Sequence, residues 1–109
     1  MKFRIYDKTG DALTTPCVQF YNEDTDQVWD NDSKSWKATS DATQSNTLVS
    51  LGTKNAITNC FSVDVPPTDG NTLTALLFND SEVATVKAVW KLNIARKLQY
   101  DPAYFPVRA

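Results

Sequence analysis

The sequence between residues 83 and 94 reads VATVKAVWKLNI, and its side chains alternate between two sets along the whole stretch. One set is apolar throughout, whereas the other contains Thr85, Lys87 and Lys91. A period of two is typical of a β-strand that buries one face. A helix is the competing interpretation, because Val83, Val86, Trp90, Ile94 and Leu98 follow a helical spacing. The alternation favours the strand, with these residues pointing inward: Ala84, Val86, Ala88, Trp90, Leu92 and Ile94.

Shorter stretches of alternating or β-branched residues occur on the N-terminal side of this strand, and turn-forming clusters separate them. The segment Asp30–Ser35 has the composition of a hairpin loop, and Pro66–Gly70 ends a strand firmly. No helix is needed before residue 94. Seven or eight short strands with turns at this spacing predict an all-β protein built as a β-sandwich. The other predicted strands are Lys2–Tyr6, Cys17–Tyr21, Val28–Trp29, Trp36–Ala38, Thr47–Leu51, Ile57–Val65 and Thr72–Phe78.

A chain of 109 residues has room for one domain with one core. No apolar run approaches the ~18–20 residues that a membrane-spanning helix needs. The N-terminal residues alternate polar and apolar side chains and lack the apolar stretch of a signal peptide. We therefore expect a protein made in a cytoplasm that does not bind membranes, with a sandwich domain over residues 1–94.

The last residues, 95–109, differ from the rest and are expected to form an irregular C-terminal arm. Pro102 and Pro106 exclude a regular element across it, and its aromatic residues are too apolar for a solvated tail. Two interpretations stay open: the arm folds back over an open sheet edge, or it lies on a neighbouring subunit. Under the second, the partner-binding residues of the arm are Arg96, Lys97, Tyr100, Tyr104, Phe105, Val107 and Arg108.

Charge is unevenly distributed along the chain. Residues 22–41 carry six acids and two lysines, whereas residues 83–109 carry five bases and one acid. These are either two solvated faces of opposite sign or surfaces that pair with neighbouring subunits. The bases are neither dense nor interleaved with stacking aromatics, so no nucleic-acid partner is expected.

The composition argues against a catalytic centre. The chain has no histidine, which removes catalytic triads, histidine bases and most zinc sites. An EF-hand starting near Asp24 would need an oxygen ligand at Val28 and a glycine at Trp29, although a looser calcium site between loops stays open. Cys17 and Cys60 lie on the strand faces opposite the apolar sets, so we expect two free thiols. We therefore expect that the chain is not an enzyme and that it binds neither a cofactor nor a metal.

The three tryptophans raise a second function class, carbohydrate binding. Trp36 and Trp90 have the parity of core residues, whereas Trp29 follows Val28 out of phase and is expected to be exposed. An exposed tryptophan suits a protein interface as well as a sugar site. A carbohydrate-binding module for a cell-surface glycan is therefore the alternative function, and a metal-dependent enzyme is a distant third.

Three segments together show a resemblance to a known family. The hairpin FYNEDTDQVWDNDSKSW over residues 20–36, the strand Cys60–Pro67 and the strand DGNTLTALLF over residues 69–78 resemble small immunoglobulin-like β-sandwich domains of tailed-bacteriophage virion proteins. The similarity covers roughly residues 18–92. The chain departs from the pattern at Asp32, where the family often has a hairpin glycine, and at Leu73, where it often has an aromatic residue.

The resemblance implies an immunoglobulin-like β-sandwich with a non-enzymatic structural role in a virion, assembled after synthesis in the host cytoplasm. The expected role is capsid decoration or a neck, tail or fibre accessory. The partners would be other virion proteins, such as the major capsid, portal or tail subunits. Trp29 would supply one contact and the C-terminal arm another. The sequence leaves open whether copies of the chain associate with each other.

Overall fold

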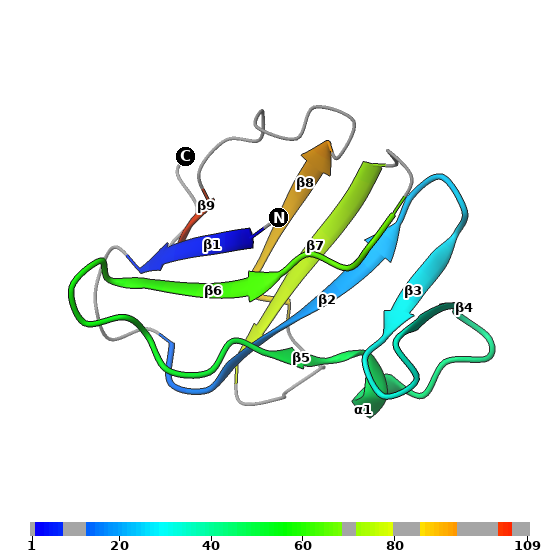
Figure 1. Ribbon diagram of the computed structural model, residues 1–109, viewed down its shortest axis with the longest axis horizontal. Coiled ribbons are helices and arrows are strands. Elements are labelled where there is room, and N and C mark those ends of the chain that lie inside the picture. Colours follow the sequence, from blue (N-terminus) through cyan, green and yellow to red (C-terminus); the bar gives the residue numbers. More distant parts are fainter. Residues whose placement is uncertain (1, 8–12, 69–71, 80–85, 94–102, 106–109) are drawn as a thin grey trace.

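The computed structural model describes residues 2–7, 13–68, 72–79, 86–93 and 103–105, and nearly all regular structure in them is β-strand. The strands form two sheets that lie across each other in two layers (Figure 1). The bounds are β1 Lys2–Asp7, β2 Pro16–Asn22, β3 Gln27–Asp30, β4 Ser35–Ala38, α1 Gln44–Thr47, β5 Val49–Ser50, β6 Cys60–Asp64, β7 Thr72–Asn79, β8 Ala88–Asn93 and β9 Ala103–Phe105.

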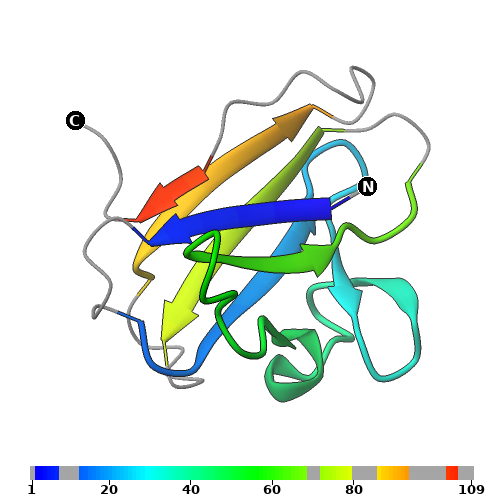
Figure 2. The same ribbon diagram turned by 60° about the vertical axis from the view of Figure 1, so that its left-hand side comes forward.

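The larger sheet has the strand order β4-β3-β2-β7-β8, and β5 adds a short pairing to β2. All of these pairings are antiparallel. The smaller sheet has the order β6-β1-β9. Here β1 runs antiparallel to β6, with Phe3 opposite Val63, and parallel to β9, with Ile5 opposite Ala103. Figure 2 shows β9 lying beside β1 at the edge of this layer.

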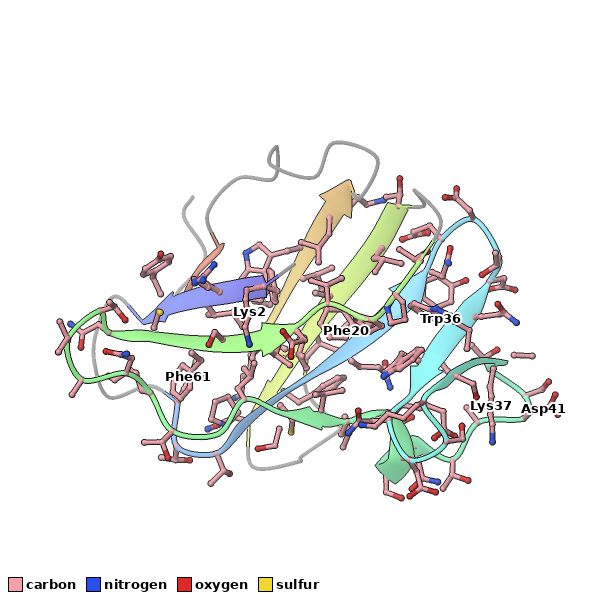
Figure 3. The ribbon with its side chains drawn as sticks, viewed as in Figure 1. Lys2, Phe20, Trp36, Lys37, Asp41 and Phe61 are labelled. Carbon is pink, nitrogen blue, oxygen red and sulfur yellow. The ribbon has the colours of Figure 1, made fainter. Side chains whose placement is uncertain are left out.

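The core fills the space between the two sheets. Phe3 has no exposed surface and contacts Phe20 and Trp90 of the larger sheet edge to face, with ring centroids 6.3 and 5.6 Å apart. Phe61 comes from the smaller sheet and belongs to the same buried cluster as Phe20, and Figure 3 labels both residues. In β1 the residues Phe3 and Ile5 are buried against the other layer and Lys2 and Arg4 are exposed, as a period of two requires.

The expected all-β class is confirmed, and every predicted strand has a counterpart in the structure. The strand expected over residues 83–94 is observed as β8 over residues 88–93, with Ala88 and Leu92 buried and Trp90 partly buried. The helical alternative does not hold there. Val86, expected to point inward, is 45% exposed because it precedes the paired part of the strand. Residues 83–85 and 94 lie outside the described part of the chain.

Two elements were not expected. The strand β9 lies in the arm that was predicted to be irregular, and it occupies the three residues between Pro102 and Pro106, so the prolines flank it without interrupting it. A single helical turn, α1, precedes β5 where the sequence predicts only a polar connection. The Thr47 hydroxyl donates to the Gln44 carbonyl oxygen at 2.7 Å and accepts from the Gln19 carboxamide nitrogen at 2.8 Å. These bonds hold the turn against the outer face of β2. No helix in the described part of the chain is long and apolar enough to cross a membrane.

Candidate binding surfaces

Trp29, the predicted contact of the acidic hairpin, does not project into solvent. Its side chain is 7% exposed and packs edge to face on Trp36, its partner across the β3–β4 ladder, with ring centroids 5.4 Å apart. The expectation of an exposed Trp29 is therefore wrong. The prediction assumed that only the face of β3 that carries Val28 is buried. The structure covers both faces, so Val28 and Trp29 are both buried.

Trp29 nevertheless contributes to a half-open pocket of about 160 Å³ between the β3–β4 hairpin and the segment that follows β6. Val49 and Pro66 give it apolar walls, and Lys34 and Asp64 supply charges of opposite sign. Asp64 is already paired with Lys2 at 3.0 Å, and this ion pair lowers the pKa of Asp64. We call this space the Trp29 pocket.

Part of the C-terminal arm lies on the domain itself. Tyr104 and Phe105 belong to β9, which pairs with the second half of β1. For this part of the arm the structure shows the first of the two open interpretations, a return to cover a sheet edge. The other predicted contact residues lie outside the described part of the chain: Arg96, Lys97, Tyr100, Val107 and Arg108.

An exposed strip runs along β8 and the residues just before it. Val86 and Val89 are 45% and 50% exposed, which is unusual for aliphatic side chains. Lys87, between them, and Lys91, two residues after Val89, are also exposed. Lys91 lies 3.8 Å from Glu23 at the end of β2. We call these four residues the β8 strip, which is apolar and basic.

A second pocket, of about 130 Å³, lies between α1, the segment before it and the outer face of β2 and β3. We call it the α1 pocket. The polar side chains that line it carry no charge, and Val28 and Ala42 are its apolar lining residues. Sequence reasoning did not find it, because the residues are distant along the chain and α1 was unexpected. The polar residues lining it are Gln19, Tyr21, Thr39, Gln44 and Thr47.

Two acids of the hairpins, Asp30 and Asp26, bond to neighbouring groups. Asp30 is 1% exposed. Its carboxylate accepts hydrogen bonds from the backbone N–H groups of Asp32 and Ser33, both at 2.9 Å, and forms an ion pair with Lys37 at 3.3 Å. The Ser33 N–H, together with the Lys37 and Asp32 contacts, lowers the pKa of Asp30. The Tyr21 hydroxyl donates to Asp26, and this hydrogen bond raises the pKa of Tyr21.

The described residues contain no cluster of three or more acidic or cysteine side chains placed to hold a metal ion. Cys17 and Cys60 are buried, one in each sheet, and neither forms a disulfide. Cys17 lies on β2 opposite Phe78, and Cys60 lies on β6 opposite Tyr6. The two thiols therefore sit in different layers and do not form an inter-sheet bridge.

Comparison with known proteins adds no relative to this description. No family model, no curated protein and no solved structure matches the chain.

Proposed function

We propose that the chain is an immunoglobulin-like β-sandwich that serves as a non-enzymatic structural protein of a bacteriophage virion. The strand order is the observation that supports the immunoglobulin-like part of the proposal, and the virion role rests on the sequence resemblance of residues 18–92. A variable-type immunoglobulin sheet has the order G-F-C-C′-C″, and strands B and E pair in the facing sheet. Assigning β1 to β4 as B, C, C′ and C″, and β6 to β8 as E, F and G, reproduces both sheets in chain order.

The differences from that pattern fit a minimal domain. Strand A is replaced by β9, which comes after the last sandwich strand and pairs with β1 in parallel. β5, in the place of strand D, pairs with β2 instead of β6. The characteristic disulfide would join strands B and F. In this assignment Cys17 and Cys60 lie on C and E, so the fold is held by its core without that bridge.

Attachment to a neighbouring subunit would use the β8 strip. Exposed aliphatic side chains beside lysines suit a partner surface that is apolar at its centre and acidic at its margin. The sequence places further bases, Arg96 and Lys97, just beyond β8. Partners of this kind include the major capsid, portal, neck and tail proteins. The carbohydrate-binding alternative rested on an exposed Trp29, and the buried ring removes that ground.

The test of this role is quantitative mass spectrometry of purified phage particles. We expect the chain in the particle at a fixed ratio to the major capsid protein. A ratio near one indicates shell decoration, and a small fraction of one indicates the neck, tail or fibres. Absence of the chain from purified particles would refute the virion role.

The β8 strip is tested in the same assay by introducing a negative charge. Val89→Glu places an acid at a half-exposed position of the strip, so it should leave folding intact and reduce incorporation at least tenfold. The matched control is Ile57→Glu, which makes the same change at a side chain that is 93% exposed in the turn before β6. Equal incorporation of the two variants would exclude the β8 strip as the attachment surface.

A further inference from the structure

The α1 pocket has the composition of a site for a small neutral ligand. Five of the side chains that line it are polar, and none is an aspartate, glutamate, lysine or arginine. An ionic ligand would lose its hydration in the pocket without gaining a charged partner, which costs free energy. The lining therefore selects against charged ligands and for ligands that only need hydrogen bonds.

Several of these polar groups are available to a ligand. Among the described residues, neither the Gln44 carboxamide nor the Thr39 hydroxyl has a hydrogen-bond partner, and Gln19 uses only its amide nitrogen. Carboxamides and hydroxyls offer both donors and acceptors. A ligand hydroxyl also does both, so it can bond to any of these groups.

Part of the site is held in place before a ligand arrives. The Thr47 side chain is 1% exposed, and its hydroxyl bridges the Gln19 carboxamide and the Gln44 carbonyl oxygen at 2.8 and 2.7 Å. The Tyr21 hydroxyl is held by Asp26. Side chains that are locked by their neighbours lose less conformational entropy on binding.

Size sets the class of ligand. A volume of about 130 Å³ corresponds to about four water molecules, well below the ~300–1,000 Å³ of drug-sized sites. Because the pocket is open to solvent on one side, it takes one face of a single ring or one small side chain, and the rest of the ligand stays outside. Val28 and Ala42 give an apolar wall and Tyr21 an amphipathic one. The matching ligand has hydroxyls on its rim and C–H groups on its faces.

We propose that the α1 pocket binds a single neutral sugar ring. The proposal is independent of a place in the virion, because it uses the outer face of β2 and β3 and not the β8 strip. In a particle that displays many copies, weak single-ring contacts would add up to useful avidity for a glycan surface.

The experiment is a titration of the isotope-labelled full chain, followed by ¹⁵N–¹H correlation NMR. The probes are methyl glycosides of glucose, galactose and mannose, N-acetylglucosamine, and glucuronic acid as the charged counterpart of glucose. A ligand of this size should bind with a dissociation constant on the order of 1 mM. We expect saturable shifts at Gln19, Thr39 and Gln44 with at least one neutral probe, and weaker binding of glucuronic acid.

Matched variants establish that the pocket is the site. Thr39→Ala/Gln44→Ala removes two exposed lining groups and should weaken binding at least tenfold. Ser40→Ala/Ser45→Ala changes the exposed neighbours of the same two residues, which do not line the pocket, and should leave binding unchanged. Three results would overturn the proposal: no saturable shift with any neutral probe, shifts confined to the Trp29 pocket, or equal binding by both double variants.

Discussion

Asp30 is a buried carboxylate whose contacts are all local. It is the last residue of β3 and accepts two backbone N–H groups of the loop, while Lys37 on β4 pairs with its second oxygen. A buried acid is tolerated only when its charge is compensated in this way. Its role is to close the β3–β4 hairpin, so it is not available to a metal or a substrate.

The first prediction concerns acid stability. Because the folded-state pKa of Asp30 is lowered, its charged form stabilises the fold above the unfolded pKa of about 4, and this stability is lost as the pH falls below it. Asp30→Asn should lower the free energy of unfolding at pH 7 and make it less dependent on pH below about 4. Urea unfolding across that range measures both. The control is Asp32→Asn, an exposed acid of the same loop; an equal effect there would contradict the assignment to Asp30.

The second prediction concerns Lys34, whose φ of 57° lies in the left-handed region. Glycine adopts this conformation without the steric cost that a Cβ imposes, although it is more flexible when unfolded. Lys34→Gly should therefore stabilise the domain by about 0.5 kcal/mol, or about 2–4 °C in Tm. Ser33→Gly, one residue earlier, should lower Tm. A fall in Tm for Lys34→Gly would show that its hydrogen bond to Asn31 outweighs the backbone strain.

At the scale of the elements, one turn recurs three times. Asn22, Asp30 and Asn55 each accept two backbone N–H groups from the residues two and three positions later. Each turn closes four positions later at a residue with positive φ, namely Asp26, Lys34 and Asn59. A threonine or serine precedes the closing residue every time. The side-chain cap shapes the turn, so no glycine is needed where Asp32 stands.

Strands were easier to predict than their surroundings. Alternating polar and apolar residues mark the two faces of a strand. The bounds of five strands could therefore be predicted to within a few residues: β1, β2, β6, β7 and β8. It does not reveal that α1 covers the outer face of β2 and β3, because that contact joins residues far apart in the chain. The burial of both Val28 and Trp29 depends on this cover and on the facing sheet. For the same reason the α1 pocket could not be predicted.

The third prediction concerns β9, which protects only part of the edge of β1. Deleting residues 103–109 should expose that edge, lower Tm and promote association of copies through β1. Deleting residues 106–109 leaves β9 in place and should change neither property. Thermal unfolding and light scattering measure the two effects. If both deletions behave like the full chain, β9 contributes nothing to the smaller sheet.

At the scale of the whole molecule, the two sheets are held together by side chains from β1 and β6 that enter the space above the larger sheet. Phe3 of β1 contacts aromatic rings on two strands of the larger sheet, Phe20 on β2 and Trp90 on β8. With no disulfide between Cys17 and Cys60, packing has to supply this cohesion. The two layers should therefore fold as one cooperative unit.

The fourth prediction tests whether the two sheets unfold as one cooperative unit. Phe3→Ala should cost about 3–5 kcal/mol, a large part of the ~5–15 kcal/mol available to a domain, and should unfold most of the population in mild urea. Val63→Ala, opposite Phe3 but only partly buried, should cost less.

The cooperativity is read from two probes of the same urea titration. In a Trp90→Phe background, which serves here as the parent chain, fluorescence comes from Trp29 and Trp36 and reports on the β3–β4 hairpin at one edge of the larger sheet. Far-ultraviolet circular dichroism reports on all strands. For one cooperative unit the two curves coincide in the parent chain and shift together in Phe3→Ala. If the fluorescence transition stays in place while the circular dichroism shifts, the hairpin folds without the smaller sheet. The Trp29 pocket would then lie across a boundary between two folding units, because its walls come from the hairpin and from the end of β6.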